Sequence, residues 1–547
     1  MLNKINMFFS RREFLLPLTL FAFFLAASLP GIQWGAPALW NPDELVWRVD
    51  MALNGAMQFD VNEPDYNYPS LPKYVMYAIG STTYGLGRSS FAFIVAARSF
   101  SAILGAIAGI LVYFLARTIG TRKRIAFLAG MFYIASGAAA ENGRFAHNDL
   151  YLLVFTILSA FFAVQYQKTL SVRRLYLSFL MVGLAASCKY TGGSLIILPI
   201  IVYLSANWKN IKTQWLAMAG RLILGAFIAY LGYGIGTPKA FVSPVGYFSN
   251  VLPALRNLTD YGFNTGTPLG LVGQWPVLRE TVGIFCYYVF LAAILWFFVR
   301  WVLWVFGRVT FADGLGANVG AFLLILLIFD LPFMISINYI GRYFIPFIPF
   351  MSILSALMIE EILSLAPDRK LVFAHPVLIT LLVLGLGYSA LRIVSISLLF
   401  LNDSRIPASE YIASFRGYQK SIEYTLYPPF IEKRKFERAH NYPIYFIEWE
   451  GDEVPTGGRF EYNQAEKGLL ERDTDYFVID SFTYGRFYSD TICATTPGEC
   501  DFFKRLIAGE VESYSLLKQF TYRLPPWLPQ VSLTAVNPDL LIFERVR

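Results

Sequence analysis

Long apolar runs alternate with short polar connections over the first 400 residues of the chain. A helix that crosses a membrane needs about 20 consecutive apolar residues. Runs that approach or exceed this length predict eleven spanning helices, and the first follows Arg11 and Arg12 without a clear small-residue cleavage site, so it is predicted to be a retained anchor. The runs lie at residues 14–29, 91–116, 125–140, 150–166, 175–187, 194–206, 222–235, 281–305, 319–337, 343–363 and 371–401.

The basic residues gather in alternate connections between these runs. Examples are residues 122–124, 173–174 and 209–212. Since lysine and arginine are enriched in the cytoplasmic loops of membrane proteins, the N-terminus is predicted to be cytoplasmic. Eleven crossings then place the C-terminal tail outside the cytoplasm.

The pattern changes near residue 402, where charged residues, proline and glycine become frequent. Segments 442–450, 475–482 and 540–546 are typical of strands, and segments 408–415 and 499–508 of helices. We therefore expect a polytopic α-helical membrane domain over residues 1–401 and a soluble extracytoplasmic α/β domain over 402–547. Two outer segments, 31–90 and 236–280, are too long to be simple turns, and such loops are often functional.

Composition supports a membrane protein and excludes an ordinary soluble enzyme. Hydrophobic residues make up 56% of the 547 residues and charged residues 15%, against about 45–50% and about 25% in soluble domains. The net charge of +7 divides into +12 for residues 1–401 and −5 for the tail. Because the excess belongs to the cytoplasmic loops, it is no evidence for a nucleic-acid partner. An integral protein of the inner or plasma membrane is predicted.

Histidine and cysteine limit the chemistry further. The three histidines, His147, His375 and His440, are far apart, which argues against a His-rich metal site or a His-based triad. Cys493 and Cys500 both lie in the polar tail. They would form a small disulfide loop in an extracytoplasmic domain, or remain two free thiols.

An adjacent pair of acids, Asp43 and Glu44, follows the first apolar run. A carboxylate at the lipid–water boundary could act as a general base. The alternative interpretation is a solvated acidic loop, or an ordinary helix start with Pro42 ahead of the acids. In the second outer segment, residues 261–268 and Trp275 could form either a gate over a cavity or an interfacial anchor.

Ionisable residues recur at the other outer helix ends. Arg144, His147 and Asp149 fall in one short connection, Lys189 in a second and Arg342 in a third. Each alone is typical of an interface anchor whose charge reaches water. Together on one side of the membrane they favour an anion-binding cavity, because such residues are costly near lipid unless they face polar surroundings.

The order of these residues along the chain, and their position on the outer side, resemble the pattern of the GT-C glycosyltransferases of family 39. That family includes protein O-mannosyltransferases and the aminoarabinose transferases that act on lipid A. Asp43-Glu44 falls where that family has its acidic motif. Residues 68–73, Tyr-Pro-Ser-Leu-Pro-Lys, resemble its His-Pro-Pro-Leu-Gly-Lys stretch with three changes. The family also has counterparts of Arg144 followed by Asp149, of Lys189, and of the run that starts at Arg342.

The resemblance implies a GT-C fold and an inverting transfer of a sugar from a polyprenyl-monophosphate donor to an acceptor hydroxyl on the outer face of the membrane. It implies roles that we adopt as expectations: Asp43 as general base, Glu44 orienting it or the acceptor, and three cations holding the donor phosphate, with five residues in support. The phosphate-binding set is Arg144, Lys189 and Arg342; the supporting set is Tyr68, Lys73, His147, Asp149 and Tyr343.

The resemblance leaves the acceptor open, as a protein, a lipid or a glycan, because the tail here replaces the late luminal domain of eukaryotic protein O-mannosyltransferases. No cofactor is firmly predicted; a divalent cation between Asp43 and Asp149 stays an alternative. A lipid-linked glycan transporter or flippase is the rival function. It would favour paired repeats and ionisable groups near the membrane centre, whereas most of those found here lie at helix ends.

Overall fold

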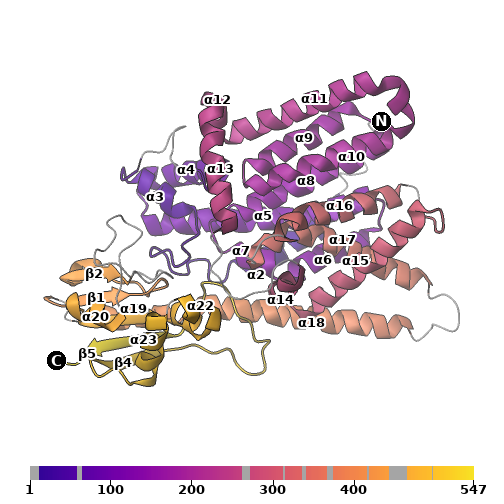
Figure 1. Cartoon of the computed structure of the whole chain (residues 1–547). Helices are drawn as coiled ribbons and strands as arrows, with labels where there is room; N and C mark the ends of the chain where they lie inside the picture. Colours follow the sequence, from indigo (N-terminus) through magenta and orange to yellow (C-terminus); the bar gives the residue numbers. More distant parts are fainter. Residues whose placement is uncertain are drawn as a thin grey trace. The chain divides into compact units, whose positions relative to one another are not determined.

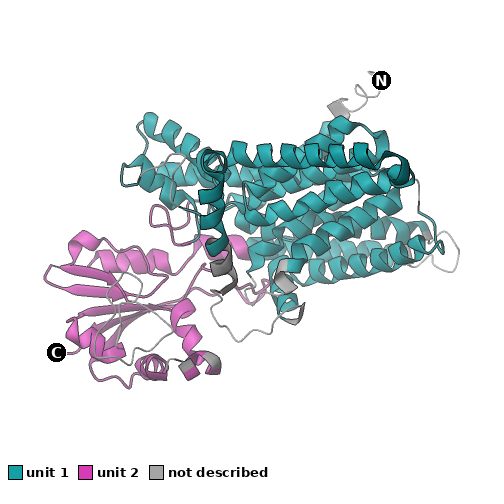
Figure 2. Cartoon of the chain, turned by 45° about the horizontal axis from the view of Figure 1, so that its top comes forward, with its two compact units in different colours: residues 1–32, 43–261, 269–394 teal, residues 33–42, 262–268, 395–547 magenta. Residues whose placement is uncertain are grey.

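The structure is a computed structural model, which describes residues 11–57, 65–260, 271–311, 314–334, 340–365, 374–415, 418–442, 465–495 and 497–547. The chain forms two compact units, coloured separately in Figure 2. Unit 1 comprises Met1–Ile32, Asp43–Tyr261 and Leu269–Val394. Unit 2 comprises Gln33–Pro42, Gly262–Pro268 and Ser395–Arg547, so it includes a piece of the first outer segment together with the tail.

Unit 1 is helical, and its long helices coincide with the apolar runs of the sequence (Figure 1). They are α2 (Arg11–Ser28), α5 (Ser90–Thr118), α6 (Lys123–Ala135), α8 (Asp149–Thr169), α9 (Val172–Ala186), α10 (Ile197–Ala206), α11 (Ile211–Gly236), α15 (Ile284–Val305), α16 (Leu315–Met334), α17 (Ile348–Leu365) and α18 (Ala374–Leu401), of which the end of α18 belongs to unit 2.

Within the described ranges, six helical segments are long and apolar enough to cross a membrane. They lie at Ser90–Thr118, Asp149–Thr169, Trp208–Gly236, Ile284–Val305, Gly341–Ser364 and Pro376–Ala413, with shorter apolar helices at Phe14–Ser28, Tyr190–Ala206 and Leu315–Leu331. The helical membrane architecture predicted from the sequence is thereby confirmed. The number of eleven crossings and the side on which the tail lies stay predictions.

Small residues allow these helices to pack closely. Helix α9 lies beside both α8 and α11 (Figure 1). A Cβ added to Gly183 of α9 would lie 1.9 Å from the carbonyl oxygen of Ala229 in α11. Only glycine permits this approach, and close backbone contact is what holds helices together in lipid, where burial of apolar surface contributes little.

The two long outer segments contain helices rather than only loops. The first holds α3 (Val46–Leu53) and α4 (Leu71–Gly85). The second holds α12 (Lys239–Val242), α13 (Pro244–Asp260) and α14 (Leu271–Val282). In α3, Val46 and Val49 are buried on one face, so tertiary packing stabilises a helix too short to be stable alone. Short 3-10 helices, η2 (Tyr190–Ile196) and η4 (Gly341–Phe347), precede α10 and α17.

Unit 2 contains a five-stranded sheet of order β2-β1-β3-β5-β4. Strand β1 (Ser421–Tyr424) pairs in parallel with β2 (Arg438–Asn441) and β3 (Tyr476–Asp480), whereas β5 (Leu540–Arg545) is antiparallel to β3 and to β4 (Tyr514–Phe520). Helices α19 (Arg405–Ala413), α20 (Ala465–Glu471), α21 (Ser481–Tyr484), α22 (Asp490–Thr495) and α23 (Pro497–Ala508) accompany the sheet.

Alternation along β3 divides the core of unit 2 between the two faces of the sheet. Phe477 and Ile479 pack with Phe503 of α23, while Val478 packs with Ile412 of α19. The α/β class, strands β3 and β5, and helices α19 and α23 were predicted and are confirmed. Strands β1, β2 and β4 were not predicted, because β1 and β2 have four residues each and β4 is largely exposed. Most of the strand expected at 442–450 lies outside the described residues.

Candidate functional site

A carboxylate–guanidinium contact joins the first outer segment of unit 1 to the start of a distant helix. Nη2 of Arg342, in η4, lies 2.9 Å from Oδ2 of Asp43. Nε of the same guanidinium lies 3.8 Å from Oδ2 of Asp149, the first residue of α8. Arg342 thus contacts two carboxylates from elements that are remote in sequence.

Lys189 and His147 complete this group around Asp149. Nζ of Lys189 donates to Oδ1 of Asp149 at 2.8 Å, and Nδ1 of His147 is hydrogen-bonded to Oδ2 at 2.8 Å. Asn148 fixes the local geometry, since its amide donates to the carbonyl of Cys188, next to Lys189, at 2.9 Å. We call Asp43, His147, Asp149, Lys189 and Arg342 the charged cluster.

Local structure explains why Asp149 is tolerated in an apolar segment. It lies in the first turn of α8, where the helix dipole and exposed N–H groups favour a negative charge. It is 1% exposed and lies beside two cations, as a buried carboxylate must. In contrast, the Asp43 side chain is 47% exposed. Asp43 is therefore the carboxylate of the cluster that a substrate could reach most readily.

Two aromatic rings cover the cluster. Nζ of Lys189 lies 4.4 Å from the centroid of the Tyr343 ring and the Arg342 guanidinium carbon lies 5.7 Å from it, distances typical of cation–π contacts. The Tyr68 ring packs edge-on against the imidazole of His147 at 5.6 Å. Burial raises the pKa of the Tyr68 hydroxyl well above its ordinary value, so this hydroxyl stays protonated.

The surroundings of Asp43 and His147 lower the pKa of both groups. Burial, the largest single effect, raises the pKa of Asp43, but the charge and hydrogen bond of Arg342 together with the effect of His147 bring that pKa below the ordinary value. Burial, and then the charge of Arg342, lower the pKa of His147 despite the opposing effect of Asp149. At neutral pH Asp43 is ionised and His147 is neutral.

A neutral His147 has one ring nitrogen that the surrounding structure leaves unused. With Nδ1–H donated to Asp149, Nε2 is an acceptor. This Nε2 is buried and has no hydrogen-bond partner among the described residues. Buried polar atoms of this kind need an explanation, and a bound substrate group is one.

Glu44, adjacent to Asp43, has a different environment. Nε and Nη2 of Arg98 in α5 donate to its two carboxylate oxygens at 2.9 and 2.6 Å, and the backbone N–H of Ala146 donates to Oε2 at 2.9 Å. Both Glu44 and Arg98 are fully buried. Glu44 therefore ties the acidic motif to α5 and to the connection that carries His147. Arg98 was not predicted, although a lone arginine inside the run at 91–116 is the signal that could have revealed it.

Arg144 lies apart from the contacts of the charged cluster. Its guanidinium is fully buried and donates to the carbonyl oxygens of Ala27, Pro30 and Ala140 at 2.7, 2.8 and 2.9 Å. The Ala27 carbonyl lies in the last turn of α2, where helix carbonyls have no partner within the helix, and Pro30 follows the end of that helix. These contacts give Arg144 a structural role, and its expected contact with the donor phosphate stays a prediction.

Lys73 also takes part in a separate buried network. Its Nζ contacts Oδ2 of Asp65 at 3.2 Å and the carbonyl oxygen of Tyr68 at 3.1 Å. Nε of Arg48 lies 3.6 Å from Asp65, and Nζ of Lys239 donates to the backbone carbonyl of Asp65 at 2.9 Å. Asp65 and Lys239 were not predicted. The network holds the chain on which Tyr68 is placed, so Lys73 supports the site indirectly.

The described residues bring together no group of three or more histidine, cysteine, aspartate or glutamate side chains suited to a metal ion. Asp43 and Asp149, the two carboxylates considered for a divalent cation, both contact Arg342. In unit 2 a disulfide joins Cys493 and Cys500. The expected gate at 261–268 lies outside the described residues.

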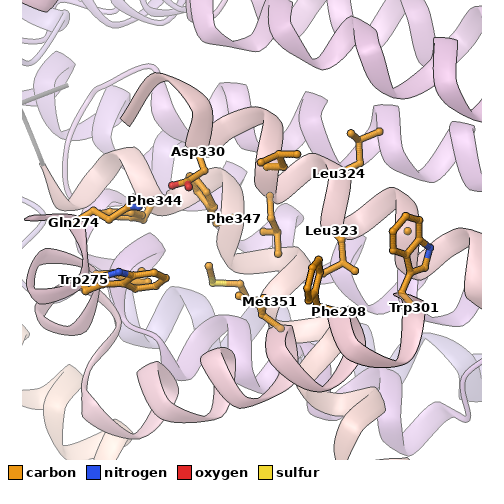
Figure 3. Close-up of a pocket in the computed structure, with 15 residues that line it drawn as sticks. Gln274, Trp275, Phe298, Trp301, Leu323, Leu324, Asp330, Phe344, Phe347 and Met351 are labelled. Carbon is orange, nitrogen blue, oxygen red and sulfur yellow. The ribbon is translucent and has the colours of Figure 1, made fainter. Parts of the chain in front are cut away.

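An apolar cavity of about 360 Å³ lies within unit 1 beside the helix that carries Arg342. Phe344 and Phe347 of η4 form part of its wall, together with residues of α14, α15, α16 and α17 (Figure 3). Figure 3 shows Gln274 and Asp330 near Phe344, with Trp301 and Phe298 farther along. Trp275, expected to be a gate or an anchor, also lines this cavity. One 3-10 helix thus presents a cation to the charged cluster and aromatic rings to an apolar cavity.

Residues 55–242 match the family model described as "Dolichyl-phosphate-mannose-protein mannosyltransferase". This match confirms the family resemblance. The matched range contains Tyr68, Lys73 and the cluster residues His147, Asp149 and Lys189, but neither Asp43 nor Arg342. No curated protein sequence matches the chain.

Three solved structures are similar to this chain at low sequence identity. An Archaeoglobus fulgidus oligosaccharyltransferase is 12% identical with a TM-score of 0.48, over 94% of this chain and 72% of that one. ArnT from Cupriavidus metallidurans, bound to undecaprenyl phosphate, is 12% identical with a TM-score of 0.46, over 96% and 97%. The S. cerevisiae Pmt1-Pmt2 complex, bound to the sugar donor, is 20% identical with a TM-score of 0.31, over 50% and 37%.

Proposed function

We propose that this protein is an inverting membrane glycosyltransferase that moves a sugar from a polyprenyl monophosphate to an acceptor hydroxyl. The observation that carries the proposal is the double role of η4. Arg342 contacts the exposed carboxylate of Asp43, while Phe344 and Phe347 line an apolar cavity. A donor that joins a charged phosphate to a long hydrocarbon chain needs these two environments side by side.

In this reaction the acceptor oxygen attacks the anomeric carbon as the bond from that carbon to the phosphate oxygen breaks. The hydroxyl proton passes to Asp43, and polyprenyl phosphate leaves. A single displacement of this kind inverts the anomeric centre. Asp43 suits the base role because it is ionised and 47% exposed, and a positioned base contributes about 10²–10⁴-fold to rate.

Lys189 and Arg342 are the cations that would bind the donor phosphate. Their side chains are 16% and 12% exposed, so a phosphate could reach them while little water surrounds them. Charge-assisted contacts are strong in such surroundings, and cations directed at the departing phosphate stabilise the charge that develops there. His147 and Asp149 support this pair, and Glu44 and Arg144 hold the backbone around it.

The family match supports this proposal, since it covers the segments that carry Tyr68, His147, Asp149 and Lys189. The match is to a family described as using a dolichyl-phosphate sugar, and a polyprenyl phosphate is the same class of donor. The outer face of the plasma membrane is the proposed location, with the N-terminus in the cytoplasm. The acceptor is proposed only as a hydroxyl of a protein, lipid or glycan.

The test compares cells that contain the wild-type chain, Asp43→Asn, Asp50→Asn or no copy of the gene. Envelope glycans, lipids and proteins are analysed by mass spectrometry for a sugar-sized mass increment. Asp50 is a matched control, because it lies in the same outer segment and is hydrogen-bonded to Tyr84 and Ser90 away from the cluster.

We expect the increment with the wild type and Asp50→Asn, and its loss with Asp43→Asn and in cells without the gene. An increment that persists in Asp43→Asn at normal level would exclude Asp43 as the base. Identical profiles with and without the gene, in cells that make the donor, would contradict the transferase function itself.

A further inference from the structure

Unit 2 contains its own cavity, of about 320 Å³, at one end of its sheet. Its wall combines the loop at 38–42, the chain that follows β1, and the end of β2. The volume is at the lower end of the range of about 300–1,000 Å³ that is typical of small-molecule sites. We propose that this cavity binds a pyranose ring of a saccharide, at a site separate from the charged cluster.

The position in the sheet is the first argument. Tyr424 and Asn441 line the cavity and are the last residues of the parallel strands β1 and β2, paired with each other in register. Strands β2 and β3 lie on opposite sides of β1, so the chain crosses from one side to the other. In open α/β sheets, ligands bind at the carboxyl ends of parallel strands near such a change of direction.

The chain beyond β1 is held in place without a ligand. Asp480, the buried last residue of β3, accepts hydrogen bonds from the Thr425 hydroxyl and from the backbone N–H of Tyr427, the latter at 3.0 Å. The backbone N–H of Phe430 donates to the Ser409 hydroxyl at 2.8 Å. These contacts fix the segment that supplies Phe430 and its neighbours to the wall, so the cavity is preformed.

Trp40 forms a rigid aromatic part of the wall. The Arg405 guanidinium carbon lies 4.5 Å from the centroid of the Trp40 ring, and the Trp34 ring packs edge-on at 5.6 Å. A Cβ on Gly35 would lie 2.7 Å from the Trp40 ring, and Gly35 has φ +64°. The backbone therefore closes directly onto this indole, and a side chain at position 35 would displace it.

The polar atoms of the wall indicate what kind of ligand fits. Trp40 is 9% exposed, and its indole N–H is buried without a hydrogen-bond partner among the described residues. Lys433 and Asn441 add an ammonium group and an amide, and none of the described lining residues is acidic. Because these groups are hydrogen-bond donors, the wall favours a ligand rich in acceptor oxygens.

A pyranose suits both the aromatic rings and the hydrogen-bond donors of this wall. Its C–H face can lie against the rings of Trp40, Tyr424 or Phe430, and its hydroxyl and ring oxygens can accept from the indole, the amide and the ammonium group. An extended peptide fits less well, because its backbone N–H groups would need acceptors that this wall supplies poorly. The cavity thus favours a saccharide over a peptide.

The test uses the full chain in lipid nanodiscs, prepared free of glucoside and maltoside detergents, whose headgroups would compete. Saturation-transfer NMR is measured at millimolar concentrations of methyl α-D-mannopyranoside, methyl β-D-glucopyranoside and methyl β-D-glucuronide, with acetyl-trialanine amide as the peptide probe. No polyprenyl donor is present, so binding is measured independently of the transfer proposed above.

At least one glycoside should receive saturation. Asn441→Ala and Trp40→Phe, which keeps a ring but removes the indole N–H, should each weaken that binding about fivefold, as expected for one lost hydrogen bond. Arg434→Ala, a change at an exposed neighbour of Lys433 that does not line the cavity, should leave it unchanged. Asp43→Asn should lose transfer and still bind the glycoside.

Three outcomes would overturn the proposal: no saturation of any glycoside, saturation of the peptide alone, or glycoside binding that Asn441→Ala and Trp40→Phe do not weaken. If Trp40→Phe unfolds, Asn441→Ala together with Lys433→Ala decides the matter, because both side chains are exposed. Loss of transfer in Asp43→Asn has no bearing on this result.

Discussion

Glu44 forms a two-point ion pair with Arg98 in the interior of unit 1, at 2.9 and 2.6 Å. The adjacent Asp43 is 47% exposed and contacts Arg342 instead. Two neighbouring acids therefore have different tasks. Glu44 anchors the outer segment to α5, and the anchored backbone presents Asp43 to the charged cluster.

Glu44→Ala should destabilise unit 1 strongly, because it leaves the buried Arg98 guanidinium without its carboxylate partner. Breaking one partner of a buried ion pair costs about 3–5 kcal/mol. The midpoint of thermal unfolding in nanodiscs is the measurement, and Asp43→Ala is the matched control, with little expected change. A Glu44→Gln/Arg98→Met double variant should recover part of the loss. Equal midpoints for Glu44→Ala and the wild type would show that the pair is dispensable.

Arg342→Lys should lower the rate of sugar transfer about 100-fold, a loss of the size seen when one positioned transition-state contact is removed. A lysine keeps the charge but lacks the planar fork that contacts both Asp43 and Asp149. Steady-state kinetics should place most of the loss in kcat. Arg300→Lys, at the pair with Glu361, is the control and should keep the wild-type rate. A rise in the donor KM alone would limit Arg342 to ground-state binding.

Arg144→Lys should lower the midpoint of thermal unfolding, and any correctly folded fraction should keep its donor KM. The reason is that Arg144 donates to three backbone carbonyls, those of Ala27 in the last turn of α2, Pro30 and Ala140. One ammonium group cannot donate to all three. Burial also lowers the pKa of the guanidinium to about 10, as expected for a cation removed from water. A stable variant with a raised donor KM would restore the phosphate-binding role.

Acidification from pH 7.5 to 5.5 should destabilise the wild type through His147. Its pKa is lowered in the folded chain from the ordinary value of 6.5, so the unfolded chain binds the proton first as the pH falls. Stability is therefore complete above about pH 6.5 and declines below it. His147→Gln should show a shallower fall in unfolding midpoint over this interval. The charged groups that surround the imidazole are Asp43, Asp149, Lys189 and Arg342. A parallel fall in both proteins would contradict the prediction.

Cys493 should be reachable from outside the cell. A Cys500→Ser variant removes its disulfide partner, and the side chain of Cys493 is only half-buried. A membrane-impermeant maleimide should then label intact cells. The two remaining cysteines, Cys188 and Cys286, are buried, so a Cys493→Ser/Cys500→Ser variant should stay unlabelled. Labelling that requires permeabilised cells would place unit 2 in the cytoplasm and contradict the eleven-crossing topology.

Asp43 and Glu44 show which properties of this chain the sequence predicts and which it does not. Hydropathy indicated the helical membrane unit and the change near residue 402, because membrane insertion depends on apolar content summed over neighbouring residues. From the charged residues at outer helix ends, the sequence predicted one anion-binding cavity shared by Arg144, His147, Asp149, Lys189 and Arg342. In the structure His147, Lys189 and Arg342 each contact Asp149, whereas Arg144 contacts backbone carbonyls. The anion-binding role stays a prediction. Charges at membrane helix ends have few polar environments to share, so their convergence follows from the topology.

Tertiary structure alone decided which of these charges are accessible. Arg144 and Lys189 are alike in sequence context, yet one is fully buried against backbone carbonyls and the other is 16% exposed beside Asp149. The surroundings of Trp40 were also decided by the tertiary structure, which places this residue in unit 2 against Arg405. The partner of a polar group depends on the packing of elements far apart in the chain, and no local pattern of residues encodes that packing. Sequence therefore determined the class of protein and the set of charged residues from which the cluster is drawn. Packing determined which of them meet and the task of each side chain.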